Sequence, residues 1–509
     1  MRLDEGAGRG LRGFFGCCCM TFAWGLAAHG YMYLNNSISH DSLNEYIADA
    51  AAMEWKAGLG RIFVPAYGQL LRGTTTLPWL IGLLSLLYIA AAAWLILRLF
   101  KVEAALPRLL ICGALCVNVT VIAITATYIN DLDCDMLGVL LATVSAWLWR
   151  EKRLGWLWGM VPLMFSLGFY QCCISVTITL AMLCCILDLA EGRPAGEVFR
   201  DGLRAVAMLI GGGLLYLLAL WLFYSFTDVQ LLTDEYNSLT TIFKFGLGRI
   251  PQFIYWGWLG TVKEIFLKSK LFPAWFSALL HFGLAGLAGA GLLLRLREKR
   301  PRAAALALMA LLLLLLPTGM NISRVLTGNL SHDLMHYALW LTYVFALVLV
   351  WRCWRQPAAR YAAAALVCVI LLGGVRTANT AYIVKDFEKD ANLSLFTRIA
   401  ADIAEVEGYE PGETPLAFVG KPSTTLKEAE GYGRIYEITG MDQGSFVLGS
   451  GTQGGYENYF EYVLLTPAAI ADDETVKAYR ESEYVQAMPA YPAEGSIELI
   501  DGCLVVKLG

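Results

Sequence analysis

Apolar runs of membrane-spanning length recur along the first three quarters of the chain, separated by short polar connections. Runs of roughly 17–25 residues match the thickness of a bilayer core, where the backbone is satisfied internally by a helix. The runs lack the alternation of a barrel strand, so the pattern predicts an α-helical polytopic membrane protein. We predict eleven spans, at residues 14–34, 77–99, 107–127, 136–149, 155–170, 172–190, 205–226, 272–294, 303–318, 335–351 and 361–378.

Lys and Arg residues gather in every second connection between these spans. Positive charge near span ends is retained in the cytoplasm, so the clusters predict the orientation. With eleven spans, all six clusters fall on one side, which places the N-terminus in the cytoplasm and the C-terminus outside. The clusters lie at residues 2–12, 98–108, 150–153, 193–204, 295–302 and 352–360.

Composition agrees with this class and divides the chain in two. The sequence is 57% hydrophobic and 16% charged, too apolar for an ordinary soluble protein. Residues 379–509 hold 22 Asp and Glu against 9 Lys and Arg, a net charge of −13 that leaves +9 for residues 1–378. We therefore predict a membrane domain over 1–378 and an acidic extracytoplasmic tail domain over 379–509. Its charge argues against nucleic acid or anionic lipid as a partner.

The tail domain has the size and pattern of a small α/β domain. Apolar residues at helical spacing predict a helix over 385–407. Short apolar runs bounded by turn residues predict strands at 415–419, 462–465 and 504–507.

The first outer loop carries a His-Asp pair seven residues beyond the first span. His40 and Asp41 are followed by Glu45 and, further along, by Arg61. A carboxylate at the membrane surface can accept the proton of a reacting hydroxyl. The alternative is structural, because Asp41 could instead cap a helix that begins at Leu43.

A second acidic group lies in the next loop on the same side, at Asp131, Asp133 and Asp135. Hard oxygen ligands could bind a divalent cation such as Mg²⁺ or Mn²⁺. The carboxylates could equally stabilise the N-terminus of the fourth span, or line the same pocket as Asp41.

Arginines on the outer side are candidates for binding a phosphate, since the guanidinium group donates two parallel hydrogen bonds. Arg61, Arg249 and Arg324 each stand near Gly or Ser, and Arg72 is a weaker candidate. Contact with lipid head groups is the alternative for each of them.

Two further polar groups interrupt or precede spans. His332 and His336 would share one helical face beside Asp333, but zinc needs further ligands and no HExxH motif accompanies them. We expect hydrogen bonding within a pocket instead. Tyr170 and Gln171 break a long apolar stretch, where Gln171 could join two helices or face sugar hydroxyls.

These residues, in this order and on one face, resemble the Gtr-type glucosyltransferases, which are multi-spanning bacterial enzymes similar to the GT-C class. The resemblance covers about residues 15–380. It rests on Asp41 and on the segments 60–65, 72–73, 77–82, 128–136, 169–171 and 332–335.

The resemblance implies a function on the outer face of the bacterial cell membrane. A glucosyl group would pass from a polyprenyl-phosphate donor to a cell-envelope glycan by a single inverting displacement. Asp41 matches the acidic base of the first outer loop, with Glu45 its nearest substitute, and Arg61 or Arg324 would contact the phosphate. The loop departs from the simplest GT-C pattern because it lacks adjacent paired carboxylates. The acidic cluster in the second outer loop of such enzymes would correspond to Asp131, Asp133 and Asp135 here.

Three alternatives remain at this level. A transporter or flippase for a lipid-linked sugar usually carries ionisable residues near mid-membrane, whereas here they lie at span ends. A related enzyme could use another sugar, such as mannose or arabinose. A scaffold that recruits partners through its acidic tail would leave the outer carboxylates and arginines without a role.

Overall fold

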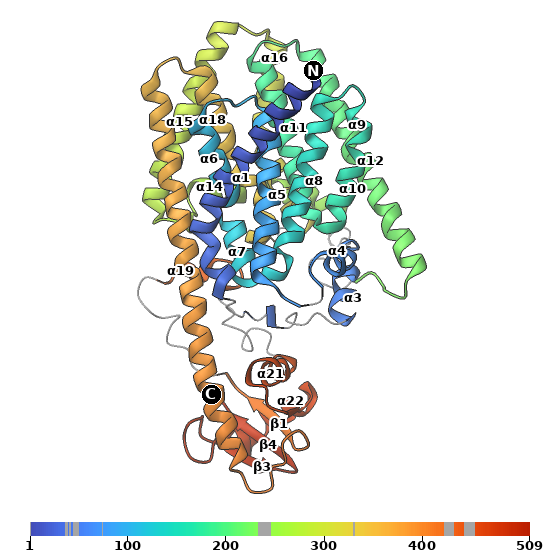
Figure 1. Ribbon diagram of the computed structural model, residues 1–509, viewed down its shortest axis with the longest axis vertical. Coiled ribbons are helices and arrows are strands. Elements are labelled where there is room, and N and C mark those ends of the chain that lie inside the picture. Colours follow the sequence, from blue (N-terminus) through green and yellow to red (C-terminus); the bar gives the residue numbers. More distant parts are fainter. Residues whose placement is uncertain are drawn as a thin grey trace.

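The computed structural model describes residues 2–35, 39, 42–43, 50–73, 75–232, 246–328, 331–421, 432–441 and 453–509. Figure 1 shows a bundle of long helices with a small domain beyond one end, joined by the long helix α19. The helices of the bundle are α1 (Arg2–Asn35), α5 (Pro78–Leu99), α6 (Ala105–Cys116), α7 (Val119–Thr127), α8 (Leu132–Glu151), α9 (Gly155–Trp158), α10 (Met160–Phe169), α11 (Ile174–Ala190), α12 (Ala195–Phe226), α15 (Ala274–Lys299), α16 (Ala303–Met320), α18 (Leu341–Cys353) and α19 (Pro357–Ala404).

The bundle is that of a multi-pass membrane protein. Among the described residues, eight helices are long and apolar enough to cross a membrane, and α6 with α7 makes a ninth if this pair, bent by 40°, is one span. Two shorter apolar helices, 155–169 and 337–353, occupy the other two predicted positions. All eleven predicted segments are therefore helical.

Asn118 explains the bend between α6 and α7. Its side-chain oxygen accepts a hydrogen bond from Val121 N at 3.0 Å, and its amide donates to the carbonyls of Ala114 and Leu115 at 3.2 and 3.1 Å. One buried side chain thus satisfies the end of α6 and the start of α7, which lets the chain change direction inside the protein.

Short helices fill the connections at the end of the bundle that faces the tail domain. They include α3 (Ala50–Gly58), α4 (Val64–Leu71), α14 (Ile250–Phe266) and α17 (Ile322–Leu326). The 3₁₀ turns are η1 (Ile129–Asp131), η2 (Gln171–Cys173), η3 (Leu247–Arg249), η4 (Asp333–Met335), η5 (Tyr337–Trp340) and, from the tail domain, η7 (Ile435–Glu437).

Basic residues tie together the opposite end of the bundle. Arg150 and Arg193 both pair with Asp188, at 2.6 and 2.5 Å. Arg352 donates to the carbonyl of Phe100 at 2.6 Å. The connections that carry the predicted Lys and Arg clusters therefore meet at one end, which we call the basic end.

The tail domain packs helices around a four-stranded sheet of order β2-β1-β4-β3, counted over its described residues. β1 is parallel to β2 and β4, and β3 is antiparallel to β4. Its elements are β1 (Pro415–Val419), α21 (Gly454–Tyr459), η9 (Phe460–Leu464), β2 (Ala469–Ile470), α22 (Asp473–Glu481), α23 (Glu483–Ala487), β3 (Ile497–Ile500) and β4 (Cys503–Lys507).

The predictions for the tail domain succeed in part. The strands at 415–419 and 504–507 are confirmed as β1 and β4, and the helix over 385–407 is confirmed as the last part of α19. The strand at 462–465 is wrong, because 460–464 form a π-helical turn. Tyr456, Tyr459 and Phe460 are buried at helical spacing up to the first residue of this turn. A short apolar run does not distinguish the end of a helix from a strand.

Gly82 of α5 lies against Tyr33 of α1, and its substitution tests how tightly these two helices pack. A Cβ added at Gly82 would lie 2.6 Å from two atoms of the buried Tyr33 ring, which is a rigid neighbour. We expect Gly82→Ala to lower the free energy of unfolding by about 1–3 kcal/mol, the usual result of overpacking. Thermal unfolding in detergent measures this. Gly286→Ala in α15 is the matched control, because nothing lies within 4 Å of its added Cβ; equal stability of both variants would contradict the packing.

Candidate active site

Polar side chains concentrate at the end of the bundle that faces the tail domain, in two clusters. The acidic–arginine cluster comes from α3, α4, η1, the start of α8 and the adjoining loops. It comprises Lys56, Arg61, Tyr67, Arg72, Asp131, Asp133 and Asp135. The histidine–glutamate cluster comes from α14, α17, η4 and the loops between them. It comprises Glu264, Lys270, Arg324, Ser331, Asp333 and His336.

Cations neutralise the first two carboxylates of the acidic–arginine cluster. Asp131 pairs with Lys56 and accepts a hydrogen bond from Arg61 Nη1 at 2.9 Å. Asp133 accepts a hydrogen bond from the Tyr67 hydroxyl at 3.0 Å. Arg72 Nε lies 3.5 Å from the same carboxylate. Such buried charges are stable only when paired in this way.

The alternatives considered for these carboxylates can now be compared. Asp131 precedes α8 but makes no side-chain capping hydrogen bond, while Asp133 and Asp135 occupy the first turn, where negative charge is favourable. The three do not form a group with metal-ligand spacing in the described structure. Their positions therefore fit a charge-balanced pocket wall better than a cation site.

Asp135 differs from its two neighbours. Its residue is only 3% exposed, yet its carboxylate makes no hydrogen bond or ion pair with any described residue. It lines a small cavity together with Tyr170, Thr120 and Met335. A buried carboxylate that faces a cavity is able to accept hydrogen bonds from a ligand hydroxyl.

Arg61 remains a cation in this environment. Burial lowers the pKa of its guanidinium, but the negative charges of Asp131 and Asp135 outweigh burial and leave that pKa above its ordinary value. The guanidinium also stacks over the Tyr170 ring, 4.7 Å from its centroid. Arg61 thus connects the paired Asp131 with the cavity that Asp135 and Tyr170 line.

Gln171 holds the loop between α1 and α5 against the bundle. Its amide donates to the carbonyl of Leu59 at 2.9 Å and to the hydroxyl of Tyr216 at 3.0 Å. Tyr216 in turn donates to the carbonyl of Gly60 at 2.9 Å. The bond to Tyr216 of α12 agrees with the expectation that Gln171 joins two helices, and the bond to Leu59 adds a contact that orients the loop carrying Arg61.

The beginning of the first loop is fixed at Ser39. The Ser39 hydroxyl donates to the carbonyl of Thr127 at 2.6 Å, at the end of α7 that leads into η1 and Asp131. Ser42 N donates to the Ser39 hydroxyl at 3.1 Å. The predicted residues His40, Asp41 and Glu45 lie outside the described part of the chain.

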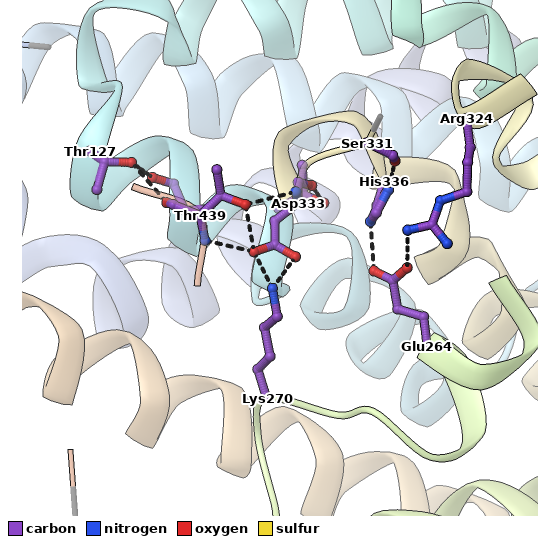
Figure 2. Close-up of polar contacts among 10 residues, drawn as sticks. Thr127, Glu264, Lys270, Arg324, Ser331, Asp333, His336 and Thr439 are labelled. Carbon is purple, nitrogen blue, oxygen red and sulfur yellow. Dashed lines mark hydrogen bonds and ion pairs between the residues drawn. The ribbon is translucent and has the colours of Figure 1, made fainter. Parts of the chain in front are cut away.

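Asp333 joins three separate segments in the histidine–glutamate cluster (Figure 2). Lys270, after α14, donates to Asp333 Oδ1 at 2.6 Å. Thr439, from the tail domain, donates to Oδ2 through its backbone N–H at 2.8 Å and its hydroxyl at 3.0 Å. The backbone N–H of Asp333 returns a hydrogen bond to the Thr439 hydroxyl at 3.1 Å.

His336 and Glu264 form a second linked pair beside it (Figure 2). His336 Nδ1 lies 2.6 Å from Glu264 Oε1, while Nε2 contacts the Ser331 hydroxyl. Arg324 Nη2 lies 4.0 Å from the other Glu264 oxygen. Glu264 was not predicted from the sequence, because a single carboxylate on the amphipathic α14 carries no local signal.

The expected helical face with His332 and His336 is wrong. His332 is extended, with φ −115° and ψ 161°, and the chain then follows two short 3₁₀ turns, η4 and η5. Burial lowers the pKa of His332, so its imidazole is favoured in the neutral form. Only His336 joins Glu264.

Glu264, Asp333 and His336 bring their possible ligand atoms within 4.8 Å of one another. Lys270 and Arg324, however, already supply positive charge to the two carboxylates. A divalent cation would have to displace both of them, so the charge balance favours an organic or anionic ligand over a metal.

The two clusters border the same region. The cavity that Asp135 and Tyr170 line is also lined by Leu334 and Met335, which directly follow Asp333. Thr120 lines this cavity and donates to the carbonyl of Asp333 at 2.7 Å. Arg249 is exposed on η3 and makes no hydrogen bond or ion pair through its side chain with another described residue.

Fold and site together define a polytopic membrane protein whose charged pocket lies at one end of its helices. The family profile described as Glucosyl transferase GtrII matches residues 30–386, and the chain belongs to this family. The protein is therefore a membrane glucosyltransferase. No curated protein shows a significant match to the chain. No solved structure does either.

The charge pair at Asp333 gives a test of the site. We expect Asp333→Asn to lower the free energy of unfolding by about 2–3 kcal/mol, because Lys270 would keep its charge in a largely buried position without a counter-ion. The double variant Lys270→Gln/Asp333→Asn should lose less unfolding free energy than the sum of the losses in the two single variants. Thermal unfolding in detergent measures both, with exposed Lys268→Gln as the control. Additive losses would show that the two charges are not coupled.

Proposed function

We propose that this glucosyltransferase moves a glucosyl group from a polyprenyl-phosphate donor to a cell-envelope glycan on the outer face of the bacterial cell membrane. The observation that carries the proposal is an apolar groove that leads along the bundle towards the charged pocket. The groove encloses about 440 Å³ between α11, α12 and α16.

The groove has the chemistry of an isoprenoid site. Its lining is almost wholly apolar and includes Ile178, Met182, Phe199 and Leu312. At one extreme it reaches Gly202 near the basic end of α12, and at the other Thr318 and Gly319, where α16 ends. A chain bound along it would bring its head group beside α17 and Arg324.

Arg324 is suited to bind the phosphate of such a donor. Its guanidinium packs against Gly260 of α14, where an added Cβ would lie 1.8 Å from Nη1. Its Nε is buried and has no hydrogen-bond partner among the described residues. Arg61, the other predicted phosphate contact, is already held by Asp131. We therefore assign the departing phosphate to Arg324, whose charge would stabilise it.

The reaction is then a single inverting displacement. The acceptor hydroxyl attacks the anomeric carbon, its proton passes to Asp41, and the bond from that carbon to the phosphate oxygen breaks. In the sequence Asp41 falls between Ser39 and Ser42, and the Ser39 hydroxyl donates to the carbonyl of Thr127, which precedes η1 and Asp131. Glu45 is the substitute base. Asp135 and Tyr170 are proposed to contact a substrate hydroxyl at the small cavity they line, whose volume of about 10 Å³ is too small for a whole sugar ring.

The orientation follows from the two ends of the bundle. The basic end collects the Lys- and Arg-rich connections and is proposed to be cytoplasmic. The charged pocket and the tail domain are then extracytoplasmic, where a lipid-linked donor and an envelope glycan meet. Polar residues at the ends of the helices favour this chemistry over transport through the bilayer.

The base is tested with Asp41→Asn and wild-type protein in detergent, supplied with radiolabelled polyprenyl-phosphate glucose and crude envelope glycan. We expect wild type to transfer the label and the variant to lose at least about 100-fold in rate, the usual contribution of a general base. Equal rates would remove Asp41 from the mechanism and direct the test to Glu45 and Asp135. No transfer by either protein, also with other polyprenyl-phosphate sugars, would favour the transporter.

The groove is tested by filling its far end. Gly202→Phe adds a bulky side chain at the lining of the groove, and nothing lies within 4 Å of an added Cβ at this position. We expect the KM for a long polyprenyl donor to rise roughly tenfold, since displaced methylene groups lose about 0.8 kcal/mol each. A donor of two isoprene units, too short to reach Gly202, should be unaffected. Gly213→Phe on the same helix, outside the groove, is the control; equal changes in both variants would refute the assignment.

A further inference from the structure

We infer that the tail domain is a component of the active site, which it completes by holding the first outer loop and Asp333 in position. This inference rests on the proposed function, in which the first outer loop carries the base. Two independent contacts, at Leu43 and at Thr439, support it.

Leu43 links the first outer loop to the tail domain. Its side chain is 0% exposed and belongs to the hydrophobic core that Phe396, Phe418, Phe460 and Leu504 form. Ser39, four residues earlier, is bound to Thr127 of the membrane domain. Ser39 is therefore attached to the membrane domain and Leu43 to the tail domain, and Asp41 falls between these two residues in the sequence.

Thr439 links the tail domain to the second cluster. Its N–H and hydroxyl donate to Asp333 Oδ2, and its carbonyl accepts a hydrogen bond from the Thr127 hydroxyl at 3.3 Å. The next residue, Gly440, has φ +84°, and an added Cβ would lie 2.7 Å from Thr127 Oγ1. Thr127 thus contacts both Ser39 and Thr439, so one residue of the membrane domain binds both the first outer loop and the tail domain.

The segment around Thr439 is packed into the core of the membrane domain. Ile435, Ile438 and Met441 are buried in the same hydrophobic core as the membrane helices. Tyr436 also donates to Glu388 of α19 at 3.2 Å. Thr439 lies beyond residues 30–386, the part of the chain that matches the family, so this contribution is made by a segment outside the shared region.

Asp333 is consequently a positioned group. Lys270 and Thr439 occupy most of its acceptor positions and fix the orientation of η4, which places Leu334 and Met335 against the cavity of Asp135. Thr439 is a positioning residue in this account: loss of its hydrogen bonds would loosen η4 without removing any group that touches the donor.

Hydrogen–deuterium exchange of the full chain in lipid nanodiscs tests the positioning without any substrate. We expect Leu43→Ala to raise exchange over residues 36–49, and Thr439→Val to raise it over 331–336. Leu43→Met and Thr439→Ser should resemble wild type, because they keep the volume or the hydroxyl. Tyr484→Phe is the control, since it removes an exposed hydrogen bond to Glu498 on the far side of the tail domain. Unchanged exchange in Leu43→Ala and Thr439→Val would overturn the inference.

The kinetic arm uses polyprenyl-phosphate glucose and crude envelope glycan. We expect kcat to fall about tenfold in Leu43→Ala and Thr439→Val with little change in the donor KM, because the apolar groove is remote from both contacts. A kcat close to that of wild type in Thr439→Ser supports the positioning role. An equal loss of kcat in Thr439→Ser and Thr439→Val overturns it. If wild type transfers nothing, the proposed function fails, and the exchange data still decide whether the tail domain holds the two segments.

Discussion

Charge compensation at the tail-facing end of the bundle is the constraint on which the rest of the structure depends. Carboxylates at this depth are costly to bury, so each needs a cation or several donors close by. Asp131 pairs with Lys56 and Arg61. Asp333 pairs with Lys270 and accepts hydrogen bonds from Thr439. These partners come from loops far apart in the sequence, so the pairing of charges also determines how the loops fold over the helices.

The same constraint separates structural carboxylates from those available to a ligand. Asp131, Asp133 and Asp333 each accept hydrogen bonds from protein donors, whereas Asp135 lines a cavity and its side chain has no hydrogen-bond or ion-pair partner in the described structure. Glu264 is intermediate, because its histidine is close but Arg324 is 4.0 Å away. A pocket arranged in this way combines a fixed wall with a few groups that can exchange partners when a substrate enters.

The sequence predicted the helices because span length and apolar composition are local properties, and β1 and β4 followed from short buried runs. Among the residues singled out from the sequence, Arg61, Asp131, Asp133, Asp135 and Asp333 lie at the tail-facing end of the bundle in the described structure. The sequence did not predict Lys56, Glu264 or Thr439, since each is significant only through a partner more than 70 residues away. The π-helical turn at Phe460–Leu464 was missed because apolar content alone does not determine backbone conformation there.

The helix α19 runs without a break for 48 residues, from the basic end of the bundle into the tail domain (Figure 1). At about 1.5 Å per residue it is about 70 Å long, more than twice the thickness of a bilayer core. Its last turns supply Phe396, Ile399 and Ile403 to the core of the tail domain. Because the hydrogen-bonded backbone is continuous, a tilt of the half of α19 within the bundle would displace the half that packs in the tail domain.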